Sequence, residues 1–303
     1  MKPKEPAGAT LGLGTSPPGR GAHRFSHAAM ATVFDVHCVH ADARYAAQAA
    51  QAAFDLVDRL EQDLSRFIEN SDISRVNHLA AGQGSRVSPW TMECLEIAWH
   101  VHGLTGGAFD ASVGSGLARL ELFPDDFTVR AREGGARLDL GGIGKGYAID
   151  RVAELLQEWE IPRALVHGGF SSVLALKAPP DRDGWPLTLS APGDGDDRVL
   201  VRVSARRRAF SASGVRKGDH ILDPRTGVPA RSRLAAWVAV PWEDGGAPAA
   251  VADALSTAFM IQPAEEIAEL CQRFPGLEAW LVPGPDARDE TASALVHLGC
   301  PGA

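Results

Sequence analysis

The stretch LDLGGIGKGYAID, residues 138–150, joins a predicted strand to a predicted helix through four glycines and Lys145. Glycine lets the backbone approach an anion closely, and the N-terminus of a helix offers unpaired N–H groups and the positive end of the helix dipole. Lys145 adds a positive charge. The stretch therefore suits a phosphate site, although a tight structural turn would need the same glycines.

The spacing within this stretch does not match the two commonest nucleotide-binding loops. A P-loop has Ser or Thr after its Gly-Lys pair, where this chain has Gly146, and its first glycine falls where this chain has Asp139. The glycines also do not follow the Rossmann pattern GxGxxG. Neither a P-loop NTPase nor a Rossmann dinucleotide-binding domain is indicated.

Three helices are predicted around this stretch. Asp42 can cap the first, Ser88-Pro89 is a cap followed by a first-turn proline for the second, and the third follows Gly146 and ends before Pro162. The first and third helices carry apolar stripes at helical spacing, made of Phe54, Val57, Leu60 and Leu64, and of Val152, Leu155, Leu156 and Trp159. These stripes are expected to be buried.

Short β-like runs dominate the rest of the chain. A strand is predicted over residues 31–40, and six more runs lie between residues 164 and 242, separated by Pro, Gly and Asp turns. Helices are predicted at about 249–260 and 263–274, followed by the strands EAWLVP and ALVHLG. This order predicts one globular α+β unit with mixed or antiparallel sheets and packed helices, and not a strict βαβ alternation.

The amino-acid composition excludes several classes of protein. The 303 residues are 45% hydrophobic and 22% charged, too apolar for an intrinsically disordered chain. Thirty Lys and Arg against 38 Asp and Glu give a net charge of −8, the wrong sign for non-specific binding to nucleic acid. The four cysteines are widely separated and suggest neither a disulfide framework nor a structural zinc site.

The first residues of the chain are expected to be less ordered than the rest. Residues 1–24 are rich in Pro and Gly and are predicted to be a disordered leader, and residues 25–303 are predicted to form the domain. No apolar run approaches the ~20 residues of a membrane span. The leader lacks the apolar stretch of a signal peptide, so a cytoplasmic location is expected, with a periplasmic one as the alternative.

Two further stretches could carry chemistry. Within VADALSTAF, residues 251–259, Asp253, Ser256 and Thr257 share about one helical turn, which suits a hard cation such as Mg²⁺ or, equally, capping of a helix start. His220 precedes the turn ILDPRTG, residues 221–227, and a histidine can accept a proton near neutral pH. Asp-Pro and Thr-Gly also mark an ordinary turn.

Taken together and in order, these segments resemble the ApbE family of FAD:protein FMN transferases, over about residues 28–285. The two most specific matches are the glycine-rich stretch and the HILDPRTG turn. The other matching segments are MAT at 30–32, LSRF and SDISRVN within 64–77, GAFDASVG at 107–114, SG at 213–214 and ADALSTA at 252–258.

The resemblance implies a T-fold-like α+β domain that binds FAD and Mg²⁺, transfers the FMN half of FAD to a Thr or Ser hydroxyl of an acceptor protein, and releases AMP. The net charge argues against a nucleic-acid partner, and the apolar runs are too short for a membrane span. The residues that it places at the FAD site are Met30, Phe67, Ala108, Phe109, Asp110, Asp139 and Lys145, with Ile221 or Leu222 also touching the ligand.

For the metal, the resemblance implies Asp253 and Thr257 as ligands, the carbonyl of Gly142 as another, and Ser256 as an additional oxygen donor. His220 matches the family histidine that helps to deprotonate the acceptor hydroxyl. Such a metal would neutralise charge that develops on the pyrophosphate, while the protein positions a weak nucleophile.

The chain departs from the family at residues 168–172, which read GGFSS where most members have Asp or Asn after two glycines. A polar contact to the flavin is then either missing or rebuilt by Ser171 and Ser172. Two other functions remain open: a FAD pyrophosphatase, in which water replaces the acceptor hydroxyl, and a FAD-binding protein without catalysis. The presence of His220, Asp253 and Thr257 argues against the second.

Overall fold

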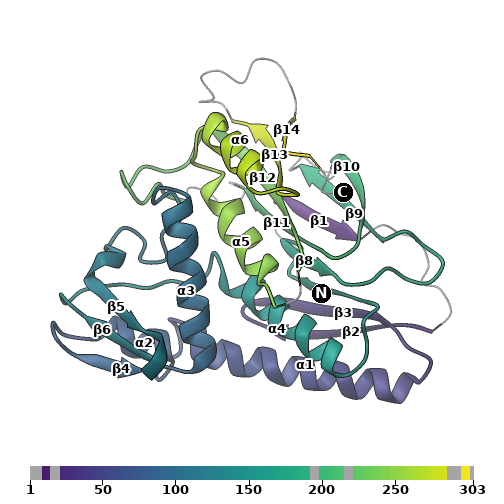
Figure 1. The fold of residues 1–303 in the computed structure, drawn as a ribbon, viewed down its shortest axis with the longest axis horizontal. Coiled ribbons are helices and arrows are strands. Elements are labelled where there is room, and N and C mark those ends of the chain that lie inside the picture. The colour runs from purple at the N-terminus through teal and green to yellow at the C-terminus, as the bar shows by residue number, and fades with distance from the viewer. Residues whose placement is uncertain are drawn as a thin grey trace, which may run out of the picture.

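The computed structural model describes residues 9–13, 21–191, 198–214, 221–243, 245–284 and 295–300. An eight-stranded sheet with the order β14-β13-β12-β11-β8-β7-β3-β2 lies at its centre, and every neighbouring pair is antiparallel (Figure 1). Its strands are β2 (Ala22–Ala29), β3 (Thr32–Val39), β7 (Ala164–Gly168), β8 (Ser172–Ala175), β11 (Arg208–Gly214), β12 (Arg233–Pro241), β13 (Glu278–Pro283) and β14 (Val296–Leu298).

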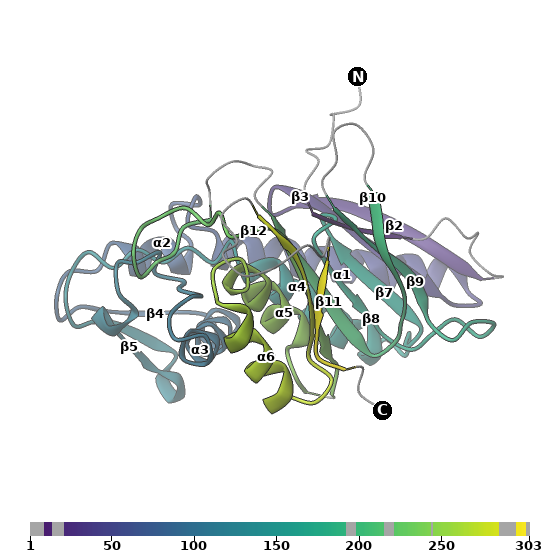
Figure 2. The same cartoon turned by 90° about the horizontal axis from the view of Figure 1, so that it is seen from above.

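Helices cover one face of this sheet and a smaller sheet covers the other (Figure 2). The smaller sheet has the order β1-β9-β10. Alternate residues of the central strands therefore enter two separate apolar cores. The covering helices are α1 (Ala43–Leu64), α4 (Gly144–Glu158), α5 (Pro248–Ala258) and α6 (Ala264–Arg273). The strands of the smaller sheet are β1 (Thr10–Leu13), β9 (Trp185–Ala191) and β10 (Arg198–Ala205).

A third group of elements lies beyond α3 (Pro89–Leu104), which itself contacts α5 (Figure 1). It contains a three-stranded sheet of order β4-β6-β5. Its members are α2 (Asp72–Asn77), β4 (Gly84–Arg86), β5 (Leu120–Phe123), β6 (Thr128–Ala131) and two short 3₁₀ helices, Leu117–Arg119 and Pro124–Asp126. Among the helices of the described ranges, none is both long and apolar enough to cross a membrane.

The helix starts predicted from the sequence are confirmed. The Asp42 carboxylate accepts hydrogen bonds from the N–H groups of Arg44 and Tyr45 at the start of α1, and the Ser88 hydroxyl accepts one from the N–H of Thr91 at the start of α3. Six of the eight predicted stripe residues are buried, and the other two, Leu155 and Trp159, are half-buried against the core. The predicted α+β class with antiparallel sheets is also confirmed.

The predicted disorder of residues 1–24 is wrong for the residues that form strands. Residues 10–13 form β1, which pairs with β9, and β2 begins at Ala22. Leu11 is fully buried, and its N–H donates to the carbonyl of Phe170 at 2.6 Å. The partners of β1 lie more than 150 residues away in the chain, so local composition does not reveal them. The remaining leader residues 1–8 and 14–20 lie outside the described residues.

Candidate functional site

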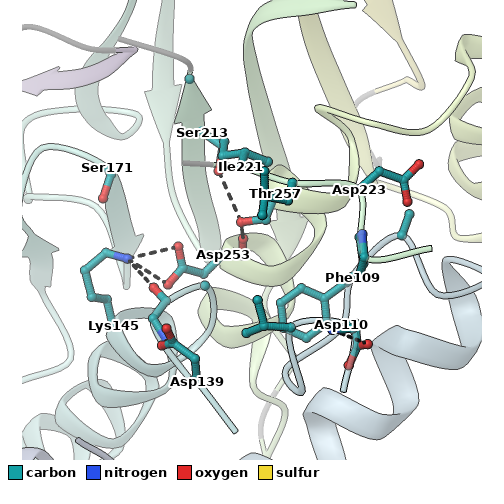
Figure 3. A pocket seen from close by; sticks show the side chains of 18 of the residues that line it. Phe109, Asp110, Asp139, Lys145, Ser171, Ser213, Ile221, Asp223, Asp253 and Thr257 are labelled. Atoms are coloured by element: carbon teal, nitrogen blue, oxygen red, sulfur yellow. Dashed lines mark hydrogen bonds and ion pairs between the residues drawn. The ribbon is translucent and has the colours of Figure 1, made fainter. Parts of the chain in front are cut away.

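Two adjoining cavities open beside the N-terminus of α4. The larger has a volume of about 840 Å³ and lies between α4, α5, the loop at 108–114 and the turn at 221–227 (Figure 3). The smaller, about 350 Å³, lies beside the β2–β3 turn and the loop that follows α1. The residues that line both cavities are Arg66, Asp139, Gly141, Lys145 and Ser171.

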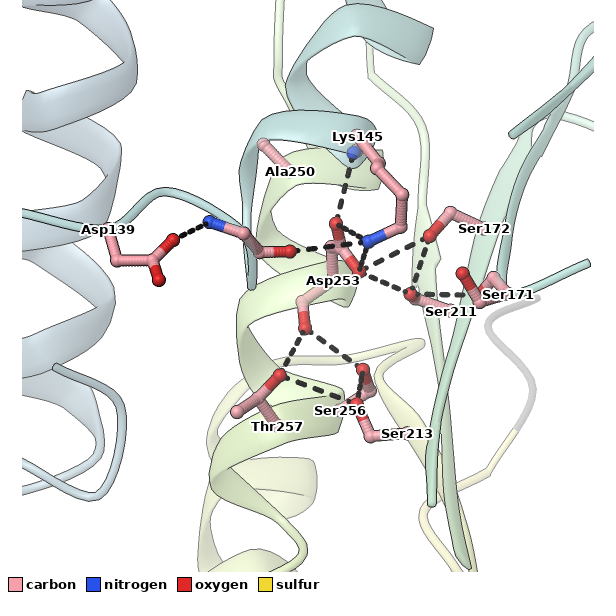
Figure 4. A network of polar contacts seen from close by, with 12 residues as sticks. Asp139, Lys145, Ser171, Ser172, Ser211, Ser213, Ala250, Asp253, Ser256 and Thr257 are labelled. Carbon is pink, nitrogen blue, oxygen red and sulfur yellow. Dashed lines mark hydrogen bonds and ion pairs between the residues drawn. The ribbon is translucent and has the colours of Figure 1, made fainter. Parts of the chain in front are cut away.

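Asp253 of α5 lies at the inner wall of the larger cavity, with its side chain only 4% exposed. Figure 4 shows the polar contacts around it. Its Oδ2 accepts hydrogen bonds from Lys145 Nζ at 3.2 Å and from the N–H of Gly146 at 3.1 Å. Its Oδ1 accepts from the hydroxyls of Ser172 at 3.2 Å and Ser211 at 3.0 Å. A buried carboxylate is tolerated only with such hydrogen-bond partners, and this network provides four of them.

The register of the central sheet places the two serines together. Ser172 of β8 lies directly opposite Ser211 of β11, and their hydroxyl oxygens are 3.0 Å apart. Phe210 and Ala212, the neighbours of Ser211 in β11, point to the opposite face and enter the core against the smaller sheet. Strand alternation thus directs the two hydroxyls to the helix that carries Asp253.

Gly146 is required by the contact between α4 and α5. A Cβ atom on Gly146 would lie 2.1 Å from the carbonyl oxygen of Ala249 and 2.8 Å from the Cα of Ala250, distances that no side chain can adopt. A Cβ on Gly144 would meet only Leu140 Cβ, at 3.9 Å. One glycine of the predicted phosphate loop therefore serves helix packing, whereas Gly141, Gly142 and Gly144 line the cavities.

We expect Gly146→Ala to destabilise the protein by about 3 kcal/mol, because the added methyl group must push two backbones apart. The free energy of unfolding from urea titrations measures this loss. The matched control is Gly144→Ala, which adds the same methyl group one half-turn earlier and should change stability by less than about 1 kcal/mol. Equal stability of the two variants would contradict this account of Gly146.

Of the other metal ligands that the sequence suggested, Thr257 reaches the cavity and Ser256 does not. Thr257 lies one turn after Asp253 and lines the larger cavity beside Gly142, where a Cβ would lie 3.4 Å from Thr257 Oγ1. Ser256 is fully buried against β11, where its hydroxyl bonds to Ser213 at 2.9 Å and donates to the carbonyl of Asp253 at 2.9 Å. The structure gives Ser256 no contact with the cavity.

Asp253, Thr257 and Gly142 offer hard oxygen atoms, the donor type that Mg²⁺ prefers, with a single carboxylate as is usual where water and phosphate complete the coordination. No group of three or more His, Cys, Asp or Glu side chains forms a denser metal site in the part of the chain that the structure describes. Lys145 contacts the same carboxylate. A cation bound to Asp253 would therefore compete with this ammonium group.

The residues predicted to contact FAD divide between the two cavities. Asp139 and Lys145 line both. Met30 and Phe67 line the smaller cavity, and Ala108, Phe109, Asp110, Ile221 and Leu222 line the larger one. His220 lies outside the described residues, but the two residues that follow it, Ile221 and Leu222, lie on the cavity wall.

Two of these residues, Phe67 and Asp110, make contacts with their neighbours in the chain. Phe67 is 81% exposed, with the guanidinium of Arg66 4.2 Å from its ring centre. The Asp110 carboxylate accepts hydrogen bonds from the N–H and hydroxyl of Ser112 at 2.7 and 2.6 Å and from the N–H of Gly114 at 3.1 Å. Asp110, which was predicted to line the FAD site, thus also holds the loop at 110–114 in shape.

Several lining residues were not among the predicted site residues. Arg66 forms an ion pair with Asp139 at 2.8 Å, and its place in the LSRF segment was the available signal. Asp223 lines the larger cavity, and a hydrogen bond from Arg225 lowers the pKa of its carboxyl. Of the two serines that could rebuild the polar contact to the flavin, Ser171 lines both cavities, whereas Ser172 is fully buried and bonds to Asp253.

The sequence is similar to a known family of proteins. The model of the ApbE family matches residues 30–281. An FAD:protein FMN transferase of Treponema pallidum is 29% identical over 299 residues, covering 82% of this chain and 80% of that protein. One from Vibrio cholerae serotype O1 is 28% identical over 250 residues, covering 69% and 72%.

Solved structures share the fold of this chain. The flavin transferase ApbE from Vibrio cholerae superimposes with a TM-score of 0.77 at 20% identity, over 91% of this chain and 96% of that one. The apo form of the flavinyl transferase ApbE from Pseudomonas stutzeri gives 0.74 at 23% identity, over 91% and 93%. With the family model matching most of its length and the fold shared, the chain belongs to the ApbE family.

Proposed function

We propose that this protein transfers the FMN half of FAD to the hydroxyl of a Thr or Ser in an acceptor protein, and that it releases AMP in a reaction that requires Mg²⁺. The curated relatives in the comparison carry the name FAD:protein FMN transferase. The observation that supports the proposal most directly is the pair of adjoining cavities with two cationic side chains, Arg66 and Lys145, where they meet.

This arrangement suits a dinucleotide. FAD has two ring-bearing halves joined by a pyrophosphate, so each cavity would take one half and the phosphates would lie at the junction. Lys145 and the N-terminus of α4 place positive charge there. The apolar side chains of Phe109 and Ile221 line the larger cavity, and Met30 and Phe67 line the smaller one.

Asp253, Thr257 and the carbonyl of Gly142 would hold Mg²⁺, which when bound neutralises charge on the pyrophosphate. Lys145 and the helix end would hold the phosphates still. The acceptor hydroxyl oxygen then attacks the phosphorus on the FMN side, and the bond from that phosphorus to the AMP oxygen breaks. In this proposal His220 takes the hydroxyl proton.

The test is an incubation of the protein with FAD, Mg²⁺ and a candidate acceptor, followed by mass spectrometry of the acceptor and chromatography of the nucleotides. Transfer predicts that the acceptor gains one FMN for each AMP released, and that replacing the acceptor Thr by Val abolishes the gain. Release of AMP together with free FMN would instead identify a pyrophosphatase. Binding of FAD with no AMP would identify a non-catalytic protein.

A further inference from the structure

The N-terminus of α5 is capped by a side chain from another helix. Its own N-cap residue, Ala247, provides no side-chain hydrogen bond. Instead, the N–H groups of Ala249 and Ala250 donate to the two carboxylate oxygens of Asp150 in α4, at 2.9 and 2.8 Å. Asp150 is buried and was assigned no role from the sequence, although it ends the glycine-rich stretch.

The reverse contact joins the same two helices. In α4, the first-turn N–H of Gly146 donates to Asp253 of α5 at 3.1 Å. Each helix therefore supplies a buried carboxylate to the N-terminus of the other, Asp150 in one direction and Asp253 in the other. The absence of a side chain at Gly146 brings the two helix ends close enough for both contacts.

The two contacts depend on each other through rigid geometry. Asp150 lies one turn after Gly146 in α4, and Asp253 lies one turn after Ala249 in α5. A helix turn keeps such positions about 5–6 Å apart, so fixing Ala249 on Asp150 also fixes the distance between Asp253 and Gly146. Both carboxyl oxygens of Asp150 accept N–H groups of α5; these two bonds lower the pKa of Asp150, but burial outweighs them and raises it to about 8.

We propose that Asp150 is a positioning residue: by holding the N-terminus of α5 on α4, it sets the Asp253 carboxylate against Gly146 and Lys145 and orients it for the cation. The part of this inference that concerns Mg²⁺ rests on the proposed function. The part that concerns the geometry of Asp253 does not.

The experiment compares Asp150→Asn with Ile267→Ala in the full-length protein. Ile267 is fully buried in α6, so its truncation lowers global stability without touching the paired helix ends. Amide hydrogen exchange is followed at Gly146, whose N–H bonds to Asp253 and not to the Asp150 carboxyl. Each variant is measured at the same number of degrees below its own melting temperature. We expect exchange at Gly146 on the order of tenfold faster in Asp150→Asn than in Ile267→Ala.

The second readout is the Mg²⁺ concentration that gives half-maximal FMN transfer, measured with the KM for FAD. We expect the magnesium requirement to rise on the order of tenfold in Asp150→Asn while the KM for FAD stays within about twofold. Faster exchange at Ala249 and Ala250 alone, with Gly146 as in the control, would overturn the inference, because the cap would then be local. If Asp150→Asn does not fold, the smaller Asp150→Ser is measured in the same way.

The two readouts separate this inference from the proposed function. If the wild-type protein transfers no FMN, the proposed function fails, yet the exchange comparison at Gly146 still decides whether Asp150 positions Asp253. If transfer occurs and both Gly146 exchange and the magnesium requirement match those of Ile267→Ala, the positioning role is refuted and the proposed function stands.

Discussion

Asp253→Ala is expected to lower the Mg²⁺-dependent turnover of FAD by roughly 10³-fold or more. Asp253 is the one carboxylate among the three groups proposed to hold the cation, and a bound metal contributes several kcal/mol of transition-state stabilisation. The measurement is the rate of AMP release across a magnesium titration. FAD binding should persist, since the walls of both cavities remain.

The matched control is Asp223→Asn, which removes a different carboxylate from the same cavity. That carboxylate is paired with Arg225 at 2.9 Å, and its loss should leave the magnesium dependence close to that of the wild type. Melting curves are needed beside the rates, because Asp253→Ala also leaves Ser172 and Ser211 without their acceptor. A normal rate in Asp253→Ala would show that its segment is only structural.

His220→Ala should slow FMN transfer by ~10²–10⁴-fold while FAD and Mg²⁺ affinities stay near normal. A general base acts on the acceptor proton and adds little to the binding of FAD, so the rate and the affinity should separate. The two residues that follow it in the chain, Ile221 and Leu222, line the larger cavity. The experiment measures the FAD dissociation constant, the melting temperature and the transfer rate on one preparation.

His167 provides the contrasting variant. It is buried, its Nε2 bonds to the carbonyl of Leu11 at 3.1 Å, and burial lowers its pKa. His167→Ala should lower the melting temperature and leave the rate constant of the folded protein nearly unchanged. If His220→Ala behaves like His167→Ala, with affinity and stability falling in proportion to the rate, then His220 belongs to the scaffold and another group accepts the proton.

Helix boundaries could be read from the sequence because their signals are local. The cap at Asp42, the cap and proline at Ser88-Pro89 and the stripes of α1 and α4 each act within a few residues of the element that they define. The strand β1 was missed because its partners are distant in the chain: four residues between Gly- and Pro-rich segments acquire order through β9, Phe170 and His167.

The candidate site was predictable to the extent that its residues follow one helix. Asp253 and Thr257 are four residues apart and share a face, whereas Ser256 is rotated by about 100° from Thr257 and faces β11 instead. The contact of Ser172 with Ser211 and Asp253 could not be predicted, because it depends on the pairing of β8 with β11. The glycine pattern likewise does not distinguish Gly146, which a neighbouring helix requires, from Gly144, which it does not.

The reciprocal capping of α4 and α5 also has a consequence for the order of folding. The Gly146 N–H and the Asp253 carboxylate are 107 residues apart in the chain, and Phe34 of β3 pairs with Gly168 of β7. Contacts of such high contact order form late, after shorter loops have closed. During synthesis, α4 leaves the ribosome long before α5 does. A chain that stops short of α5 therefore lacks Asp253 and Thr257, and the proposed cation site is complete only after α5 has packed on α4.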